Sequence, residues 1–93
     1  MSFETALGAV LKDLRIRRGW TQAQFHGVVS AQYLSDLEFG KRAPSLVILR
    51  AICDHLGVEL ATVLILAGAR DEPVVDPDDL LRRVERELAA LKY

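Results

Sequence analysis

The sequence predicts an all-α protein, in which five short helices form one bundle and a linker leads to a sixth, amphipathic helix. Apolar residues recur at helical spacing, and no stretch shows the period-2 alternation of a strand bounded by hairpin turns. Residues that start and stop helices separate these apolar stretches. The chain has 93 residues, 51% of them hydrophobic, which suffices for one compact domain and an appendage.

The first two helices are predicted from one apolar stripe and the caps that follow it. Gly19 comes after a basic last turn and stops the first helix. Thr21 caps the second helix, with Gln24 three residues later completing a capping box. The stripe of the first helix has the spacing i, i+4, i+7, i+8, i+11 and consists of Phe3, Leu7, Val10, Leu11 and Leu14.

Two serines predict the starts of the third and fourth helices, because Ser is a favoured N-cap. Ser30 precedes the third helix, and Ser45 precedes a fourth that runs to Gly57. A loop at 40–44 separates them. The fifth helix is expected from about Glu59 to Ala67 and is apolar almost all round, so it must be covered on more than one side.

The last third of the chain divides into a linker and a helix. We assign residues 1–70 to the bundle, 71–76 to an acidic, Pro-containing linker and 77–93 to the C-terminal helix. Asp76 and Pro77 are typical of a helix start. The apolar residues of this helix are spaced 3, 4, 3, a seam of two heptads that suits dimerisation or covering of the core: Leu81, Val84, Leu88 and Leu91.

Charge and composition restrict the function classes. The net charge of −1 conceals a difference between residues 1–70, with eight Lys/Arg against six Asp/Glu, and residues 71–93, with four against seven. Basic residues of the first part gather at 12–18 and 41–42, and such clusters suit phosphate binding. A single cysteine, no signal-peptide pattern and no bilayer-length apolar run favour a cytoplasmic protein.

Catalysis and metal binding are not expected. The sequence has no Ser/His/Asp set, no paired-carboxylate cleft and no Gly-rich phosphate loop. His26, His55 and Cys53 lack metal-ligand spacing. We therefore predict no enzyme activity, no metal and no cofactor, and we interpret Cys53 as a small buried hydrophobic residue whose redox activity the sequence leaves open.

Three segments together resemble the Cro/lambda-repressor type of helix-turn-helix, the XRE family. They are LGAVLKDLRIRRGWTQ at 7–22, YLSDLEFGKRAPSL at 33–46 and LGV at 56–58, and the resemblance covers roughly residues 6–67. It implies a five-helix bundle that binds double-stranded DNA as a symmetric homodimer, usually as a transcriptional repressor. The chain departs from the common pattern in the joint between its second and third helices. That joint is about two residues shorter, which predicts the loss of about half a turn from the second helix.

DNA recognition by such a motif needs side chains that read bases and side chains that hold phosphates. The first turn of the third helix supplies the predicted base-reading residues, with Gln32 suited to adenine: Ser30, Ala31, Gln32 and Tyr33. Asp36 would repel phosphate and is expected to be turned aside. The predicted phosphate contacts are Gln22, Thr21, Ser35, Lys41, Arg42 and Arg18. For Gln22 the family resemblance implies the same role.

Further residues are assigned to structure and assembly. The resemblance implies an ion pair between Arg15 and Glu38 that ties the first helix to the end of the third. We expect the dimer interface on the fifth and sixth helices, at Val63, Leu64, Leu66, Leu81, Val84, Leu88 and Leu91. Two alternatives remain open: an antitoxin-type regulator that also binds a toxin through the acidic C-terminal segment, and a protein-interaction module that has lost DNA binding.

Overall fold

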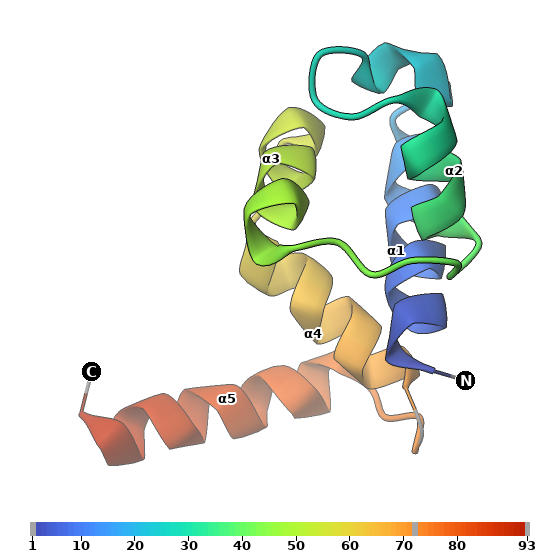
Figure 1. Ribbon diagram of the computed structural model, residues 1–93. Helices are drawn as coiled ribbons and strands as arrows, with labels where there is room; N and C mark the ends of the chain where they lie inside the picture. Colours follow the sequence, from blue (N-terminus) through green and yellow to red (C-terminus); the bar gives the residue numbers. More distant parts are fainter. Residues whose placement is uncertain (1, 72, 93) are drawn as a thin grey trace.

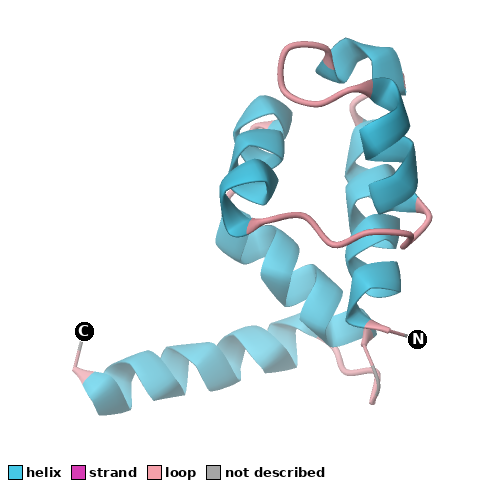
Figure 2. Ribbon diagram, in the orientation of Figure 1, coloured by secondary structure: helices cyan, strands magenta, loops and turns pink. Residues whose placement is uncertain are grey.

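The computed structural model describes residues 2–71 and 73–92 of the chain, and these residues form helices and loops without a strand (Figures 1 and 2). This confirms the all-α prediction. One short 3-10 helix, η1, stands where the second helix was expected. The elements in order are α1 (Phe3–Arg17), η1 (Gln22–Phe25), α2 (Ala31–Glu38), α3 (Leu46–Leu56), α4 (Leu60–Arg70) and α5 (Pro77–Leu91).

The predicted caps are present because each depends on a hydrogen bond between near neighbours. The Ser30 and Ser45 hydroxyls accept the first-turn N–H groups of α2 and α3, at 3.0 and 3.2 Å. The carboxylate of Asp76 accepts the N–H of Asp78 at 2.8 Å and begins α5. Gly57 ends α3 with a φ of 74°, the left-handed conformation that glycine adopts most readily.

The second helix is reduced further than predicted. The expected capping box is present, because Thr21 donates its N–H to the side-chain oxygen of Gln24 at 2.6 Å. The helix nevertheless consists only of the four 3-10 residues of η1. Gly27 has a φ of 93° and lies in the hydrogen-bonded turn that follows η1, where the N–H groups of Val28 and Val29 donate to the Phe25 carbonyl oxygen. The second helix is therefore a single short 3-10 element, while the cap of α2 stays in place.

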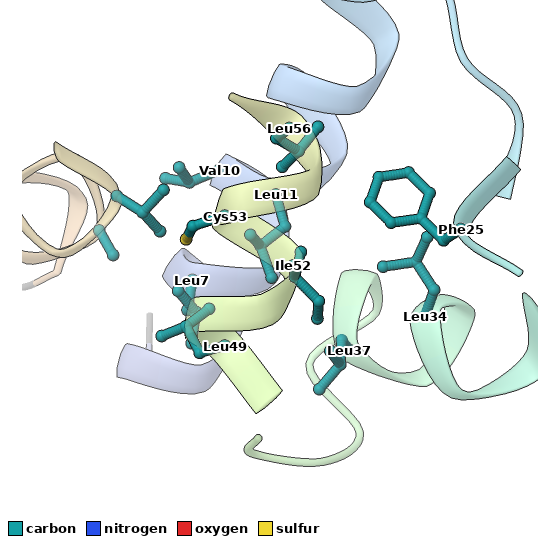
Figure 3. Packing of buried hydrophobic residues seen from close by; sticks show 12 residues of the cluster. Leu7, Val10, Leu11, Phe25, Leu34, Leu37, Leu49, Ile52, Cys53 and Leu56 are labelled. Atoms are coloured by element: carbon teal, nitrogen blue, oxygen red, sulfur yellow. The ribbon is translucent and has the colours of Figure 1, made fainter. Parts of the chain in front are cut away.

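The core lies between α1, α2, α3 and α4, with η1 closing one end. Figure 3 shows Phe25 beside Leu34 on one side of α3 and Val10 on the other. Phe25 and Cys53 are fully buried, with an exposed fraction of 0%. Because one face of η1 is fixed in the core by Phe25, the rest of the shortened segment is held without a regular helix.

The fifth helix, α4, ends three residues later than predicted and crosses α1 in the lower part of Figure 1. Its last residue, Arg70, pairs with Asp13 of α1 at 3.1 Å. Val63 corrects one prediction: it has an exposed fraction of 0% and belongs to the core of its own subunit, so it cannot contact a partner. Leu64 and Leu66 are half-buried against the same core.

The C-terminal helix leaves the bundle. Its first turns contact the end of α4, where a side-chain carbon on Gly68 would lie 3.3 Å from Leu80. Beyond this contact α5 extends away from the other helices (Figure 1). None of its described residues is buried, and the exposed fractions of Leu81, Leu88 and Leu91 are 40%, 47% and 66%. Within one chain, α5 therefore covers little of the core.

Among the described residues, no single helix is long and apolar enough to cross a membrane. Taken together, α3 and α4 have the length and apolar composition of a membrane span, but the chain bends by 107° at the break between them. Ile52, Cys53, Leu56 and Val63 of this pair are core residues.

Candidate nucleic-acid interface

Helix α2 lies against α1 on the outside of the bundle (Figure 1). The two backbones approach closely at Gly8, where a side-chain carbon would lie 2.9 Å from the carbonyl oxygen of Glu38. Only glycine permits this approach, because a β-carbon at such a distance would overlap the oxygen. Leu34 and Leu37 anchor the inner face of α2 in the core. The outer face of α2 is therefore held rigidly and directed away from the bundle.

The first turn of α2 presents the residues that the sequence predicted to read bases. Ser30, Ala31 and Gln32 are exposed, and Tyr33 is half-buried. The Ser30 hydroxyl is used by the cap, so it supports the helix rather than the outer surface. Gln32 is the one amide side chain of this turn. It donates from Nε2 to the Asp36 carboxylate at 3.0 Å.

Asp36 is held by two neighbouring side chains of this surface. It lies one helical turn after Gln32, on the same face of α2, and its second carboxylate oxygen lies 3.9 Å from Nε of Arg42. The Arg42 guanidinium in turn stacks on the Tyr33 ring, with its central carbon 4.6 Å from the ring centroid. The spacing of Gln32 and Asp36 in the sequence was the signal that could have predicted this contact.

Lys41 and Arg42 follow α2 and are both exposed, as a phosphate-binding role requires. Lys41 shares a second feature that the sequence did not reveal. Its ammonium and that of Lys12 on α1 lie 5.8 and 5.7 Å from the ring centroid of Phe39, whose exposed fraction is 65%. Basic groups from α1 and from the loop after α2 thus meet around one exposed aromatic ring.

The predicted ion pair between Arg15 and Glu38 is present and is largely buried. Arg15 donates to the two oxygens of Glu38 at 2.7 and 3.0 Å and to the Trp20 carbonyl oxygen at 2.8 Å. The exposed fractions of the two charged side chains are 12% and 2%. The hydrogen bonds to Glu38 raise the pKa of Arg15, so the guanidinium stays charged. This pair ties α1 to the end of α2.

Gln22 joins that network. Its Nε2 donates to Glu38 at 3.1 Å, and the residue is half-buried. One N–H of the amide is thus directed inward to Glu38, and the second N–H is the group left for a phosphate contact. Thr21, by contrast, is exposed beside the start of η1, and Ser35 is half-buried on α2.

Arg18 has a role that the sequence did not predict. Its guanidinium donates from Nε at 2.9 Å to the carbonyl oxygen of Leu56, the last residue of α3, and it lies over the Trp20 ring. A cation at this position satisfies a carbonyl that the helix itself leaves unpaired. Arg18 is therefore better described as a clamp between α1 and α3 than as a phosphate ligand.

A cluster of three aromatic rings packs against η1 and holds it in place. The His55 ring lies 5.1 Å from Trp20 and 4.9 Å from Phe25, measured between ring centroids. Its Nε2 lies 2.9 Å from the carbonyl oxygen of Gln24 in η1. This contact gives His55 a structural role, and the Trp20 ring packs against both His55 and Phe25.

Among residues 2–71 and 73–92, no three His, Cys, Asp or Glu side chains are grouped so that they could hold a metal ion. Cys53 is buried, and this burial raises the pKa of its thiol. At neutral pH the thiol is therefore protonated and packs as an apolar group.

The chain matches a protein family, described as a helix-turn-helix domain, over residues 6–64. The transcriptional regulator ClgR of Mycobacterium tuberculosis, strains CDC 1551 and H37Rv, is 41% identical over 66 residues. That alignment covers 69% of this chain, and the chain spans only 59% of the length of those relatives.

Solved structures agree with the sequence comparison. The crystal structure of the clp gene regulator ClgR from Corynebacterium glutamicum superposes with a TM-score of 0.72 and 35% identity, covering 78% of this chain and 97% of that one. A second crystal structure of the same regulator has a TM-score of 0.70 and 31% identity, covering 98% and 90%. The chain belongs to this family of helix-turn-helix domains, and the relatives to which it is similar are named transcriptional regulators.

Proposed function

We propose that this protein binds a specific double-stranded DNA operator as a homodimer in the cytoplasm and represses transcription there. The observation that carries the proposal is the outer face of α2. Its exposed first turn carries Gln32, and the exposed cations of Lys41 and Arg42 follow its end. A recognition helix placed in the major groove uses this arrangement, with base contacts at its start and phosphate contacts beside it.

The side chains predict different effects on binding. Gln32 offers an amide that pairs with adenine, and a good bidentate pair contributes ~1–3 kcal/mol of discrimination. Lys41 and Arg42 contribute charge, which acts on all sequences. Thr21 and Ser35 remain proposed phosphate contacts, as does Gln22 through the N–H that its hydrogen bond to Glu38 leaves unused.

Dimerisation is proposed through the exposed apolar seam of α5 together with the neighbouring part of α4. Leu81, Leu88 and Leu91 are exposed in the single chain, whereas Val84, Leu64 and Leu66 are half-buried. A stable helix needs an apolar stripe such as this one to be covered. A twofold dimer would place two copies of α2 ~34 Å apart, so that both enter one face of the DNA.

The exposed α5 seam also supports a second candidate, an antitoxin-type regulator whose α5 binds another protein. A second copy of the chain is the simpler occupant, because the seam consists of apolar side chains that a copy of the same helix can cover. Isolation of the protein with a small basic partner bound to α5 would favour the antitoxin role. A protein-interaction role without DNA binding requires that no operator exists.

The test is a titration of labelled DNA at low salt. Because the solved relatives are named regulators of clp genes, regions upstream of clp genes are the first DNA to try. Gln32→Ala is expected to reduce the preference for the operator over unrelated DNA. Lys41→Ala and Arg42→Ala should each weaken binding to both DNAs and lower the slope of log K against log salt by about one. Equal losses on both DNAs from Gln32→Ala would refute the base-reading role.

A further inference from the structure

The recognition surface contains one negative charge whose position the proposed function does not explain. Asp36 lies in the middle of α2, between the predicted base-reading residue and a predicted phosphate-binding residue. Negative charge beside DNA opposes binding to every sequence, because it repels the phosphates. A carboxylate at this place must therefore act on something other than overall affinity, or it only weakens binding.

The contacts of Asp36 connect both kinds of residue. One carboxylate oxygen accepts a hydrogen bond from Nε2 of Gln32 at 3.0 Å, and the other lies 3.9 Å from Nε of Arg42. Its backbone carbonyl accepts the N–H of Lys41 at 2.8 Å, which fixes the start of the basic loop. The carboxylate is three-quarters buried, with an exposed side-chain fraction of 25%.

The hydrogen bond between Asp36 and Gln32 determines the orientation of the Gln32 amide. An amide has an oxygen that accepts and a nitrogen with two N–H groups, whereas an ionised carboxylate only accepts. The nitrogen of Gln32 must therefore face Asp36, since the reversed amide would place its oxygen against the carboxylate. One N–H is used by Asp36, and the second N–H and the oxygen remain for a ligand.

This remaining pair matches the major-groove edge of adenine. Adenine presents N7 as an acceptor beside the N6 amino donor, so a bidentate partner must offer one N–H and one oxygen in a fixed order. We propose that Asp36 is a positioning residue for base recognition: it selects the amide orientation of Gln32 that reads adenine. The proposal rests on the proposed function, because it assumes that Gln32 meets a base.

Two variants of Asp36 and one control variant of Asp79 test the proposal. Asp36→Asn keeps the size of the side chain but can donate as well as accept, so either orientation of the Gln32 amide becomes satisfied. Asp36→Glu retains an acceptor-only group at the same helical spacing, so it should preserve the discrimination between bases. Asp79→Asn removes an equal charge on α5, outside the proposed DNA-binding surface of α2, and is the matched control.

The measurement is the dissociation constant of each protein for the selected operator and for its single-base variants. Gln32→Ala is measured first. The base pair at which this variant discriminates less than the wild type is the one that Gln32 reads. At that pair Asp36→Asn should lower discrimination about 2- to 10-fold, as expected for releasing one held side chain. Loss of the charge should also tighten binding to all sequences alike. Asp36→Glu and Asp79→Asn should keep discrimination at the wild-type level.

The double variant Gln32→Ala/Asp36→Asn should discriminate no less at that pair than Gln32→Ala alone, because the positioned group is absent from both. The proposal is overturned if Asp36→Asn changes all operator variants by one common factor, or if the double variant loses further discrimination. Wild-type protein without any sequence preference would instead refute the proposed function, and the role of Asp36 with it.

Discussion

Removal of Arg15 is expected to destabilise the protein more than most single substitutions, because it leaves a buried carboxylate without its cation. Glu38 has a side-chain exposure of 2% and would retain only the hydrogen bond from Gln22. Breaking a buried pair by removing one partner costs about 3–5 kcal/mol. For a domain of this size each kcal/mol corresponds to about 4–8 °C in melting temperature, so Arg15→Met should lower it by at least about 12 °C.

The assay is urea and thermal unfolding followed by circular dichroism, with a paired control. The double variant Arg15→Met/Glu38→Leu replaces both charges by apolar groups and should recover most of the lost stability, since no buried charge remains. If Arg15→Met unfolds at the wild-type urea concentration, the pair does not hold α1 against α2. If the double variant is as unstable as the single one, packing of the Arg15 side chain and not charge compensation is responsible.

Four other substitutions, at Gly8, Leu81, Leu88 and Cys53, have distinct expected outcomes. Gly8→Ala should cost about 1–3 kcal/mol of unfolding free energy and weaken DNA binding, because its methyl group would push α2 away from α1 at the Leu37 carbonyl. Leu81→Glu and Leu88→Glu should change the stability of the single chain by less than about 0.5 kcal/mol yet yield monomers in sedimentation, where persistent dimers would exclude the α5 seam. Burial raises the pKa of Cys53 above the unfolded value of 9.0, so its contribution to stability is complete below that pH and is lost as pH rises through the folded pKa. In urea unfolding from pH 7 to 10.5, the free energy of unfolding should fall more steeply with pH for the wild type than for Cys53→Ala. Equal slopes for the two proteins would contradict this role of the thiol.

The sequence predicted well those features that depend on neighbouring residues. Ser30, Ser45 and Asp76 each bond to an N–H two or three positions later, so the helix starts could be read directly. The ion pair of Arg15 and Glu38 followed from the family resemblance and is present.

Contacts between distant segments could not be read in this way. Arg18 reaches a carbonyl 38 positions later, and the Gln22 amide turns inward to a carboxylate 16 positions later. The apolar face of α4 gave no signal that Val63 faces its own core, because a helix that is apolar all round has no single inner side. The shortening of η1 depends on how Phe25 is anchored in that core, which only the assembled bundle shows.

The central claim is that α2 reads DNA sequence as one half of a symmetric pair. Selection of bound fragments from random DNA, followed by sequencing, tests binding and symmetry together. The account predicts enrichment of an inverted repeat with half-site centres about 10 base pairs apart, each half containing an adenine whose importance disappears in Gln32→Ala. Recovered fragments with the composition of the starting pool, or a single unrepeated half-site, would contradict it.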